Sequence, residues 1–394
     1  MPLHLCFDFE NMFSCMLCLL LFIDNVNVMW CMDPHSLAPC LMESVMQLEC
    51  LLAGEHSDSR AVSEQAVVSV QGRLRKCSRF WTDKLEASQY VCDIITSGYR
   101  LPFLVFPPAV CAKNNKSAIE HATFVSEAIQ ELLEAGCVTR VSSCPTVCSP
   151  LQVAVNAKGK RRLVIDLRYV NQYLHLTKFK YEGLNLVPVL FQKGDHMITF
   201  DLKSGYHHVD IHEDSQQYLG FSWGEGRHRE FYIFRVLPFG LASACYVFTK
   251  LLRPLVKRWR AMGIHVILYI DDGICASSSI AKCIKDRDVI VSDLERAGFV
   301  LNVTKSCLEP CQIVEWLGFI VDLSAGCFRV PQDKVCRLKN AIQAISSNMV
   351  NARSLASVIG QIISMSLALG PVSRLQTRAM YAVLNQWKIG RAHV

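Results

Sequence analysis

The sequence predicts an α+β fold, with hairpins in its central part and helices near its C-terminal end. The first observation is the stretch His265–Ser277, HVILYIDDGICAS, where apolar, β-branched runs flank the adjacent acids Asp271 and Asp272. Such runs on both sides of a turn are typical of a hairpin, and Asp272-Gly273 is a turn signal. The second observation is that apolar residues recur at helical spacing between positions 335 and 384.

Length and composition indicate a folded protein large enough for more than one domain. The chain has 394 residues, of which 51% are hydrophobic and 19% charged. Its net charge of +6 permits contact with nucleic acid without requiring it. The apolar run Met12–Ile23 is too short to span a bilayer, and it follows Asp8 and Glu10 rather than basic residues. We therefore expect an intracellular protein, cytoplasmic and/or nuclear, with no membrane partner.

The cysteines do not form a recognisable framework. There are 19 of them, without the regular spacing of a disulfide-bonded domain. Closely spaced pairs lack a second pair at zinc spacing, so we expect reduced thiols and no zinc knuckle. These pairs are Cys15 and Cys18, Cys144 and Cys148, and Cys307 and Cys311.

In the N-terminal third we expect a segment to which no structure can be assigned, followed by two helices. Residues 1–78 carry no usable motif and are expected to be poorly ordered or unassigned. A short helix is then expected to end at Gly98, and Ser117-x-x-Glu120 is a capping-box pattern. The apolar positions after it recur at helical spacing until Gly136, a natural stop.

The following stretch alternates as strands. Residues 138–170 predict two strands joined by a basic turn at 157–160, which suits either phosphate contact or plain solvation. Residues 197–211 predict a strand ending in Asp201, a position typical of a metal ligand or of a helix cap. A hairpin across 224–226 is expected within 218–234.

Helices then frame the acidic hairpin. Leu237-Pro-Phe-Gly240 is expected to open a helix that Pro254 kinks or splits. A helix over 281–297 should stop at Gly298, followed by a strand and loop containing Lys305. Residues 316–321 and 327–330 predict a hairpin, and three helical patterns follow it.

Three acids, Asp201, Asp271 and Asp272, form what we call the acid triad. Nucleotidyl transfer uses two divalent ions, one to activate the attacking 3′-hydroxyl and one to hold the triphosphate. Mg²⁺ prefers carboxylate oxygens and substrate phosphates, so acids on neighbouring strands meet this need. Acids on buried strands would also be costly without a cation. We therefore expect two Mg²⁺ ions, with Mn²⁺ as the alternative.

From about residue 90 to 385 the chain resembles retroelement reverse transcriptases. The resemblance rests on the order and spacing of six stretches, which together are more specific than any one of them. They are GKRRLVIDLRYVN (159–171), FDLKSGYHHVDI (200–211), LPFGLASACYVFTKLL (237–252), YIDDG (269–273), GFVLNVTKS (298–306) and WLGF (316–319). The resemblance implies a right-hand polymerase, with fingers and an antiparallel-sheet palm over 79–326 and a helical thumb or connection over 327–387.

Within that family the closest likeness is to tyrosine-recombinase, DIRS-like retrotransposons, and the Ty3/gypsy group is the runner-up. The cues are SGYRLPF (97–103), KNNKSAIEH (113–121) and IGQIISMSLALGPVSRLQTRAMYAVLN (359–385). Neither an aspartic-protease triplet nor an integrase is present to support the runner-up. Residues 388–394 resemble a translated sequencing adaptor and are expected to be a non-native tail. An RNase H domain and a recombinase would follow in an intact element.

The resemblance assigns roles to individual residues. The acid triad would hold the metals, with the Leu202 carbonyl as a further ligand, and Lys305 would protonate the leaving pyrophosphate. Tyr206 would exclude a 2′-hydroxyl by steric clash. The remaining dNTP-binding residues would be Arg162 and Lys160 on the triphosphate, with Lys158 as the alternative to Lys160, and Phe239 and Gly240 lining the nucleotide. Primer and template would contact Tyr269, Trp316, Leu317 and Gly318.

Three functions stay open from the sequence. The first is RNA-directed DNA polymerisation, with a primed RNA or DNA template and dNTPs as partners and a homo-oligomer as an open assembly. The second is a catalytically inactive, nucleic-acid-binding remnant of a retroelement polyprotein, which the intact acid triad opposes. The third is a primer-dependent RNA polymerase with the same palm, which Tyr206 opposes. Lys305 remains open to a simpler interpretation as a solvated lysine.

Overall fold

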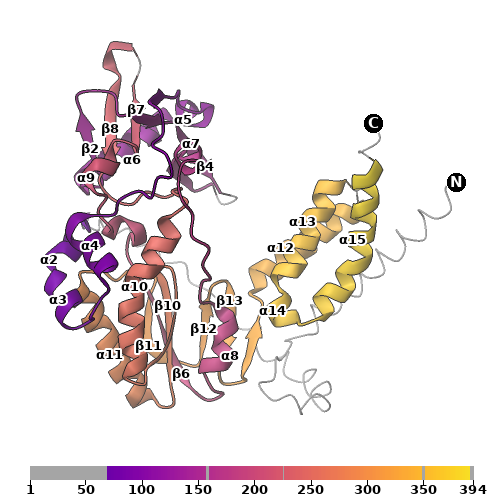
Figure 1. Cartoon of the computed structure of the whole chain (residues 1–394). Coiled ribbons are helices and arrows are strands. Elements are labelled where there is room, and N and C mark those ends of the chain that lie inside the picture. The colour runs from indigo at the N-terminus through magenta and orange to yellow at the C-terminus, as the bar shows by residue number, and fades with distance from the viewer. Residues whose placement is uncertain (1–68, 157–158, 225, 348–350, 391–394) are drawn as a thin grey trace. The chain divides into compact units, whose positions relative to one another are not determined.

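The structure is a computed structural model that describes residues 69–390 except 157–158, 225 and 348–350 (Figure 1). The expectations for residues 1–68 and 391–394 fall outside the described residues. The described chain divides into two compact units. The first unit holds Ile198–Pro310 and the described residues up to Leu190, and the second holds Phe191–Met197 and the described residues from Cys311 onward.

A four-stranded sheet in the order β11-β6-β10-β9 carries the acid triad. Its strands are β6 (His196–Asp201), β9 (His265–Tyr269), β10 (Asp272–Ser277) and β11 (Cys307–Cys311). Helices α10 (Ala244–Ala261) and α11 (Ile280–Ala297) run beside it, and each packs on a strand, α10 on β9 and α11 on β10 (Figure 1). The apolar face of α10 is buried, and its Trp259 ring meets Phe200 of β6 edge-on at 6.2 Å. Burial of these large rings anchors the strands that carry the acids.

The predicted hairpin around Asp271 and Asp272 is confirmed, but the predicted Asp-Gly turn is wrong. Asp272 pairs with Tyr269, so the turn is made by Ile270 and Asp271, with Ile270 at φ 57°. Gly273 lies inside β10, where an added Cβ would lie 2.1 Å from the Phe200 ring. The glycine is required because a ring approaches the strand closely, and not because a turn needs its freedom.

A second sheet of the first unit has five strands in the order β1-β3-β7-β8-β2. These strands are β1 (Val110–Cys111), β2 (Val138–Val141), β3 (Val147–Ser149), β7 (Gly220–Trp223) and β8 (Glu230–Phe234). β1 and β7 both run parallel to β3, and the predicted hairpin within 218–234 is confirmed as β7 and β8. β4 (Leu151–Val155) and β5 (Arg161–Ile165) form a separate antiparallel hairpin. One continuous cluster of buried apolar side chains joins both larger sheets to their helices.

The predicted capping box at Ser117 is wrong. Helix α5 (Lys116–Glu120) begins after Asn115, and Ser117 lies inside the helix, where its hydroxyl accepts a hydrogen bond from the Val153 amide at 3.1 Å. The chain breaks at His121 and continues as α6 (Ala122–Glu134), and the predicted stop at Gly136 has φ 73°. The sequence pattern correctly predicted a helical region, but the Ser117 hydroxyl bonds to a distant strand instead of capping the helix.

The short elements of the first unit complete it. They are α2 (Arg73–Lys76), α3 (Ser78–Asp83), α4 (Gln89–Ser97), α7 (Arg168–Asn171), η2 (Leu184–Leu186), α8 (Val187–Leu190), η3 (Gly205–His208), α9 (Glu213–Gln216) and η4 (Gly226–His228). The predicted helix ends at Gly98 and Gly298 are confirmed, with φ 88° and 97°. Pro254 was predicted to kink or split its helix. The split is wrong, because α10 is continuous across Pro254, and the helix begins at Ala244 rather than at Leu237.

The second unit combines a three-stranded sheet with helices. Strands β12 (Ile313–Trp316), β13 (Phe319–Asp322) and β14 (Cys327–Arg329) pair antiparallel in that order. The predicted strand over 316–321 is wrong at its start, because Leu317 and Gly318 form a left-handed turn at φ 47° and 73°. The predicted helical patterns are confirmed by α12 (Gln332–Ser347), α13 (Ala352–Ser364), α14 (Ser366–Leu369) and α15 (Val372–Gly390).

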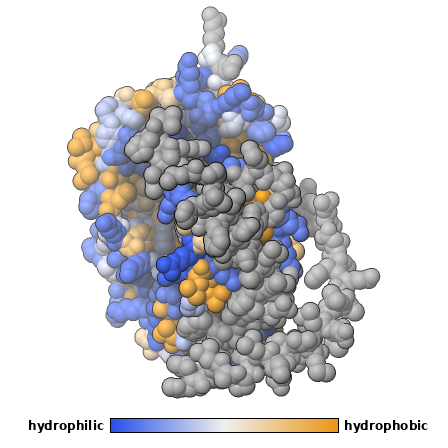
Figure 2. Space-filling view, turned by 90° about the vertical axis from the view of Figure 1, so that its right-hand side faces the viewer, coloured by the Kyte–Doolittle hydropathy of each residue, from blue (hydrophilic) through white to orange (hydrophobic). Residues whose placement is uncertain are grey.

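Two surface properties bear on partners. Where described residues are visible, the face in Figure 2 is hydrophilic surface interrupted by separate hydrophobic patches. Among the described residues, no helix combines the length and the apolarity that crossing a bilayer requires.

Candidate active site

The acid triad lies where two neighbouring strands of the four-stranded sheet meet. Asp201 ends β6, Asp271 lies in the turn, and Asp272 begins β10, the strand beside β6. Burial, the charges of Asp271 and Asp201, and a hydrogen bond with Asp201 raise the pKa of Asp272 to about 6. Burial, and then the charge of Asp201, also raise the pKa of Asp271. The three carboxylates therefore repel one another in a half-buried setting.

Backbone hydrogen bonds hold the acids in register. The Leu202 amide donates to the Asp271 carbonyl at 3.0 Å, and the Asp201 amide donates to the Ser306 hydroxyl at 3.0 Å. The chain then turns at Gly205, where an added Cβ would lie 3.1 Å from a carboxylate oxygen of Asp271. Gly205 thus leaves space beside the Asp271 carboxylate, and any larger residue would reduce that space.

These donors fit a hard divalent cation. All are carboxylate oxygens, the ligand type that Mg²⁺ and Mn²⁺ prefer. A cation would favour the charged form of Asp272, against the burial and the carboxylate repulsion that raise its pKa. The predicted carbonyl ligand, Leu202, accepts the Gly205 amide at 3.3 Å and keeps a second lone pair. The structure thus brings these four predicted ligand residues to one end of the sheet.

Lys305 lies beside the triad as predicted. Its ammonium is 3.9 Å from a carboxylate oxygen of Asp201, and its side chain is 69% exposed. Its charge lowers the pKa of both Asp271 and Asp272 against the larger raising effects. An exposed lysine at this distance forms a weak, adjustable ion pair rather than a fixed structural one.

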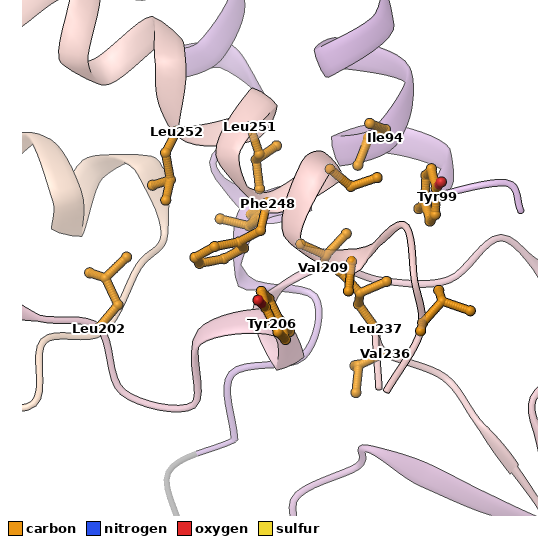
Figure 3. Close-up of a cluster of buried hydrophobic side chains, with 14 of the residues drawn as sticks. Ile94, Tyr99, Leu202, Tyr206, Val209, Val236, Leu237, Phe248, Leu251 and Leu252 are labelled. Atoms are coloured by element: carbon orange, nitrogen blue, oxygen red, sulfur yellow. The ribbon is translucent and has the colours of Figure 1, made fainter. Parts of the chain in front are cut away.

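Tyr206 is held in an aromatic cluster next to the acids. Its hydroxyl lies 2.9 Å from the thiol of Cys245, and its ring lies edge-on to Phe248 at 5.3 Å. Figure 3 shows Tyr206 close to Phe248 among buried apolar side chains. Phe239 lies 5.2 Å from Tyr206 and is 53% exposed. The charge of Asp271 contributes to the raised pKa of Tyr206, after burial and Cys245, so the ring is near the triad.

His208 is a supporting residue that the sequence did not single out. One ring nitrogen contacts the Gly205 carbonyl at 3.1 Å, and the other lies 3.1 Å from the Val300 amide, which can only donate. These partners assign the ring proton to Nδ1. Burial lowers the pKa of His208 to about 4, and that of His207 likewise. Neutral His208 therefore ties the turn after Asp201 to the segment before Lys305.

The predicted triphosphate-binding residues lie on the β4–β5 hairpin. Arg162 faces Ala154 across the hairpin, and its side chain is exposed. Lys160 is exposed at the start of β5, with its amide donating to the Asn156 side chain at 2.9 Å. Within the described part of the chain, no ion pair joins either residue to the acid triad. The structure leaves both cations exposed, where a ligand can reach them.

Gly240 is positioned by a residue that the sequence did not mark. The Asn171 side chain donates to the Gly240 carbonyl at 2.9 Å and accepts the Ala242 amide at 2.9 Å. Gly240 has φ 95°, a conformation that favours glycine. Asn171 ends the stretch GKRRLVIDLRYVN, but spacing alone gives an asparagine no role.

The predicted primer and template residues divide between the two units. Tyr269 faces Asp272 across the hairpin, and its ring lies 5.3 Å from Tyr181. Trp316, Leu317 and Gly318 belong to the second unit. The structure thus joins Tyr269 to the acid triad and assigns the other three to a separate unit.

Local contacts shape the turn in the second unit. Trp316 is 4% exposed, and its indole N–H has no partner among the described residues. The Gly318 carbonyl accepts the Lys334 ammonium at 2.5 Å.

Comparison with known proteins finds similarity to one family over part of the chain. Residues 154–321 match the family model described as reverse transcriptase (RNA-dependent DNA polymerase). The Pol polyprotein of transposon 297 of Drosophila melanogaster is 24% identical over 309 residues, 75% of this chain and 27% of that protein. The Pol polyprotein of transposon gypsy from the same organism is 30% identical over 205 residues, 50% of this chain and 19% of that protein. The chain thus spans about a quarter of the length of such curated relatives.

Solved structures confirm the fold class. The foamy viral protease-reverse transcriptase in complex with double-stranded DNA has a TM-score of 0.54 at 17% identity, covering 84% of this chain and 62% of that one. The same kind of protein in complex with an RNA/DNA hybrid has a TM-score of 0.52 at 16% identity, covering 79% and 46%. The predicted α+β polymerase fold is therefore confirmed, and the sequence is similar to retroelement polymerases.

Proposed function

We propose that this chain, a reverse transcriptase of the retroelement kind, extends a primer 3′-hydroxyl with dNTPs on an RNA template. The observation that carries the proposal is the acid triad, in which burial and neighbouring carboxylates raise the pKa of Asp272 to about 6. Three acids held this way are costly without a cation and useful with one. The family match covers the whole triad, since residues 154–321 include all three acids.

The triad is proposed to hold two Mg²⁺ ions, with Mn²⁺ as the alternative and the Leu202 carbonyl as a further ligand. When bound, such ions activate the 3′-hydroxyl and neutralise charge on the triphosphate and the leaving pyrophosphate. The chain's own contribution is to keep the carboxylates in register through the amides of Leu202 and Asp201 and to leave space at Gly205.

Lys305 is proposed as the proton donor to the leaving pyrophosphate. Its ammonium is exposed and lies 3.9 Å from Asp201, so it can turn to a phosphate without breaking a buried contact. The simpler alternative is that it only pairs with Asp201. A Lys305→Arg variant separates the two, because arginine keeps the charge and does not lose a proton. A drop in the rate with unchanged binding of dTTP supports the donor, and an unchanged rate supports the ion pair.

The nucleotide is proposed to lie against Tyr206 and Phe239. The Tyr206 ring is fixed by Cys245 and Phe248, so it cannot move aside for a 2′-hydroxyl without losing both contacts. Phe239 presents an exposed ring next to it, and Gly240 completes this surface. Arg162 and Lys160 are proposed to bind the triphosphate, where the planar guanidinium suits phosphate oxygens.

The duplex is proposed to contact Tyr269, Trp316, Leu317 and Gly318. The solved structures with this fold are described in complex with double-stranded DNA and with an RNA/DNA hybrid, which supports a primed RNA or DNA template for this chain. Fingers and palm are proposed over 79–326 and a helical thumb or connection over 327–387. A DIRS-like element is the proposed source, with the Ty3/gypsy type as runner-up.

One assay tests the proposal: purified chain with poly-rA/oligo-dT and Mg²⁺, given dTTP or UTP, beside an Asp271→Asn control. Incorporation of dTTP that the variant loses supports reverse transcription. No incorporation with retained template binding would overturn it in favour of an inactive, nucleic-acid-binding remnant. Preferential incorporation of UTP would overturn it in favour of an RNA polymerase. Template binding in either case should weaken with salt, as phosphate contacts release counterions.

A further inference from the structure

Three cysteines meet in the five-stranded sheet, apart from the acid triad, and we call them the cysteine cluster: Cys111, Cys144 and Cys148. Their sulfur atoms all lie within 4.8 Å of one another. Cys111 on β1 is directly opposite Cys148 on β3, and Cys144 comes from the loop before β3. Cys148 is buried, whereas Cys111 and Cys144 are exposed, so solutes can reach the cluster from one side.

The backbone holds these cysteines together. The residues on either side of Cys111 form hydrogen bonds with the segment that carries Cys144 and Cys148. The Val110 amide donates to the Thr146 carbonyl and the Ala112 amide donates to the Cys148 carbonyl, both at 2.9 Å. Pro145, the neighbour of Cys144, packs so closely on β7 that a Cβ at Gly220 would lie 2.5 Å from its ring. The sulfur positions are therefore set by two strands and a packed proline.

We propose that the cysteine cluster binds one Zn²⁺ ion through three thiolates. Zinc binds cysteine sulfur at about 2.3 Å, which puts two sulfurs of a tetrahedral site about 3.8 Å apart. Sulfurs within 4.8 Å of one another reach that separation by moving less than about 1 Å, a change that side-chain rotation supplies. Soft thiolate ligands also favour zinc over the hard cations suited to the acid triad.

Arg229 fits this proposal by charge and by geometry. Its guanidinium donates to the Cys111 sulfur at 3.0 Å and is itself held by two bonds to the Ser222 hydroxyl at 2.8 and 3.0 Å. Three thiolates and Zn²⁺ carry a net charge of −1, which the guanidinium balances. Hydrogen bonds to ligand atoms of this kind orient and stabilise metal sites.

The fourth position of the site is left to solvent. Among the described residues, no histidine, aspartate or glutamate joins the three sulfurs at ligand distance. The exposed side of the cluster admits water, so a three-thiolate, one-water site follows. Such an ion would fasten the two ends of the segment between Cys111 and Cys144, which carries α5, α6 and β2.

The experiment is zinc binding by the purified, fully reduced chain, freed of metal and compared with three single variants. The variants are Cys111→Ser and Cys144→Ser, both at exposed positions, and Cys336→Ser as the matched control, an exposed cysteine of the second unit. We expect the unaltered chain and the control to bind one Zn²⁺ per chain at a site where either cluster variant binds it at least about tenfold more weakly.

Cobalt substitution provides a second measurement that does not depend on stoichiometry. Co²⁺ bound by thiolates in a tetrahedral site shows sulfur-to-metal charge-transfer absorption, and we expect each cluster variant to weaken it while the control keeps it. Circular dichroism spectra that match the unaltered chain exclude unfolding as the cause. Equal zinc affinity in all four proteins, or no zinc binding by the reduced unaltered chain, would overturn the proposal. A disulfide among the three in place of zinc under reducing conditions would overturn it too.

Discussion

The acid triad and the cysteine cluster are both groups of three side chains in the first unit that we propose to bind cations, yet their surroundings differ. The triad offers hard oxygen ligands, and burial together with mutual repulsion raises the pKa of Asp272 to about 6. The cluster offers soft sulfur ligands, and a guanidinium contacts one of them. The triad carboxylates therefore repel one another, and a bound cation would relieve this repulsion, whereas the cluster already has a positive charge beside one sulfur. The difference teaches that ligand type and neighbouring charge, rather than ligand count, separate a proposed catalytic site from a proposed structural one.

The largest expected effect is a loss of dTTP incorporation in an acid-triad variant that keeps its zinc binding. Asp201→Asn should lower dTTP incorporation by about a thousandfold or more, because it removes a carboxylate that the reaction is proposed to need for its cations. The same variant should bind zinc as the unaltered chain does. Primer extension and zinc titration on one preparation check both parts. Loss of zinc binding together with incorporation would show that the variant disturbs the whole unit.

The next effect tests the aromatic cluster beside the triad. Tyr206→Ala should raise the use of UTP relative to dTTP by about 10- to 200-fold, the range that a steric pocket difference usually provides. Tyr206→Phe is the matched control, because it keeps the ring and loses only the contact of the hydroxyl with Cys245. The ratio of kcat/KM for the two nucleotides measures the effect. Unchanged selectivity in the alanine variant would remove Tyr206 from the nucleotide site.

A smaller effect concerns the histidines behind the triad. Burial lowers the folded-state pKa of His207 and His208 to about 4, against about 6.5 when unfolded. Below pH 6.5 the unfolded chain takes up protons that the folded chain refuses, so stability falls as the pH drops from 6.5 towards 4. Between pH 7 and 5 we expect a loss of about 2 kcal/mol for each histidine.

Denaturant unfolding at the two pH values measures this loss. His208→Gln should make the loss of stability between pH 7 and 5 smaller by about 2 kcal/mol. His228→Gln, the same replacement at an exposed histidine, provides the matched control. A pH dependence that survives in His208→Gln at full size would contradict the assignment.

The smallest expected effect is a gain in the stability of the folded chain when Asp272 of the acid triad is replaced. The raised pKa of Asp272 means that the folded chain holds this proton more tightly than the unfolded chain does. Its destabilising contribution therefore appears as the pH rises from about 4 to 6 and is complete above that. Without divalent cations, Asp272→Asn should stabilise the chain by about 1 kcal/mol at pH 8, after discounting for solvent screening, and by much less at pH 4. Unfolding in EDTA at both pH values measures it, and a loss of stability at pH 8 would contradict the account.

The sequence predicted the features that short patterns determine. The apolar runs around Asp271 fixed the hairpin, and Gly98, Gly136 and Gly298 ended helices as predicted. The turn was predicted at Asp272 and Gly273, but Ile270 and Asp271 form it. Gly273 is a glycine because the ring of Phe200, more than seventy residues earlier in the chain, packs directly against it. Local turn chemistry could not anticipate that contact.

Features that depend on contacts between distant parts of the chain could not be predicted from the sequence. Cys144 and Cys148 had no partner by spacing, because the third sulfur comes from Cys111 through the register of two parallel strands. Asn171 and His208 position backbone groups of distant segments, and no local pattern marks such a role. The roles of the predicted site residues remain predictions that the variants above are designed to test.

Whether the acid triad catalyses DNA synthesis is decided by primer extension on poly-rA/oligo-dT with the unaltered chain and with Asp271→Asn, with template binding recorded for both. We expect Mg²⁺-dependent incorporation of dTTP by the unaltered chain, loss of it in the variant, and equal template binding. Template binding without incorporation by the unaltered chain, or incorporation that the variant retains, would contradict it.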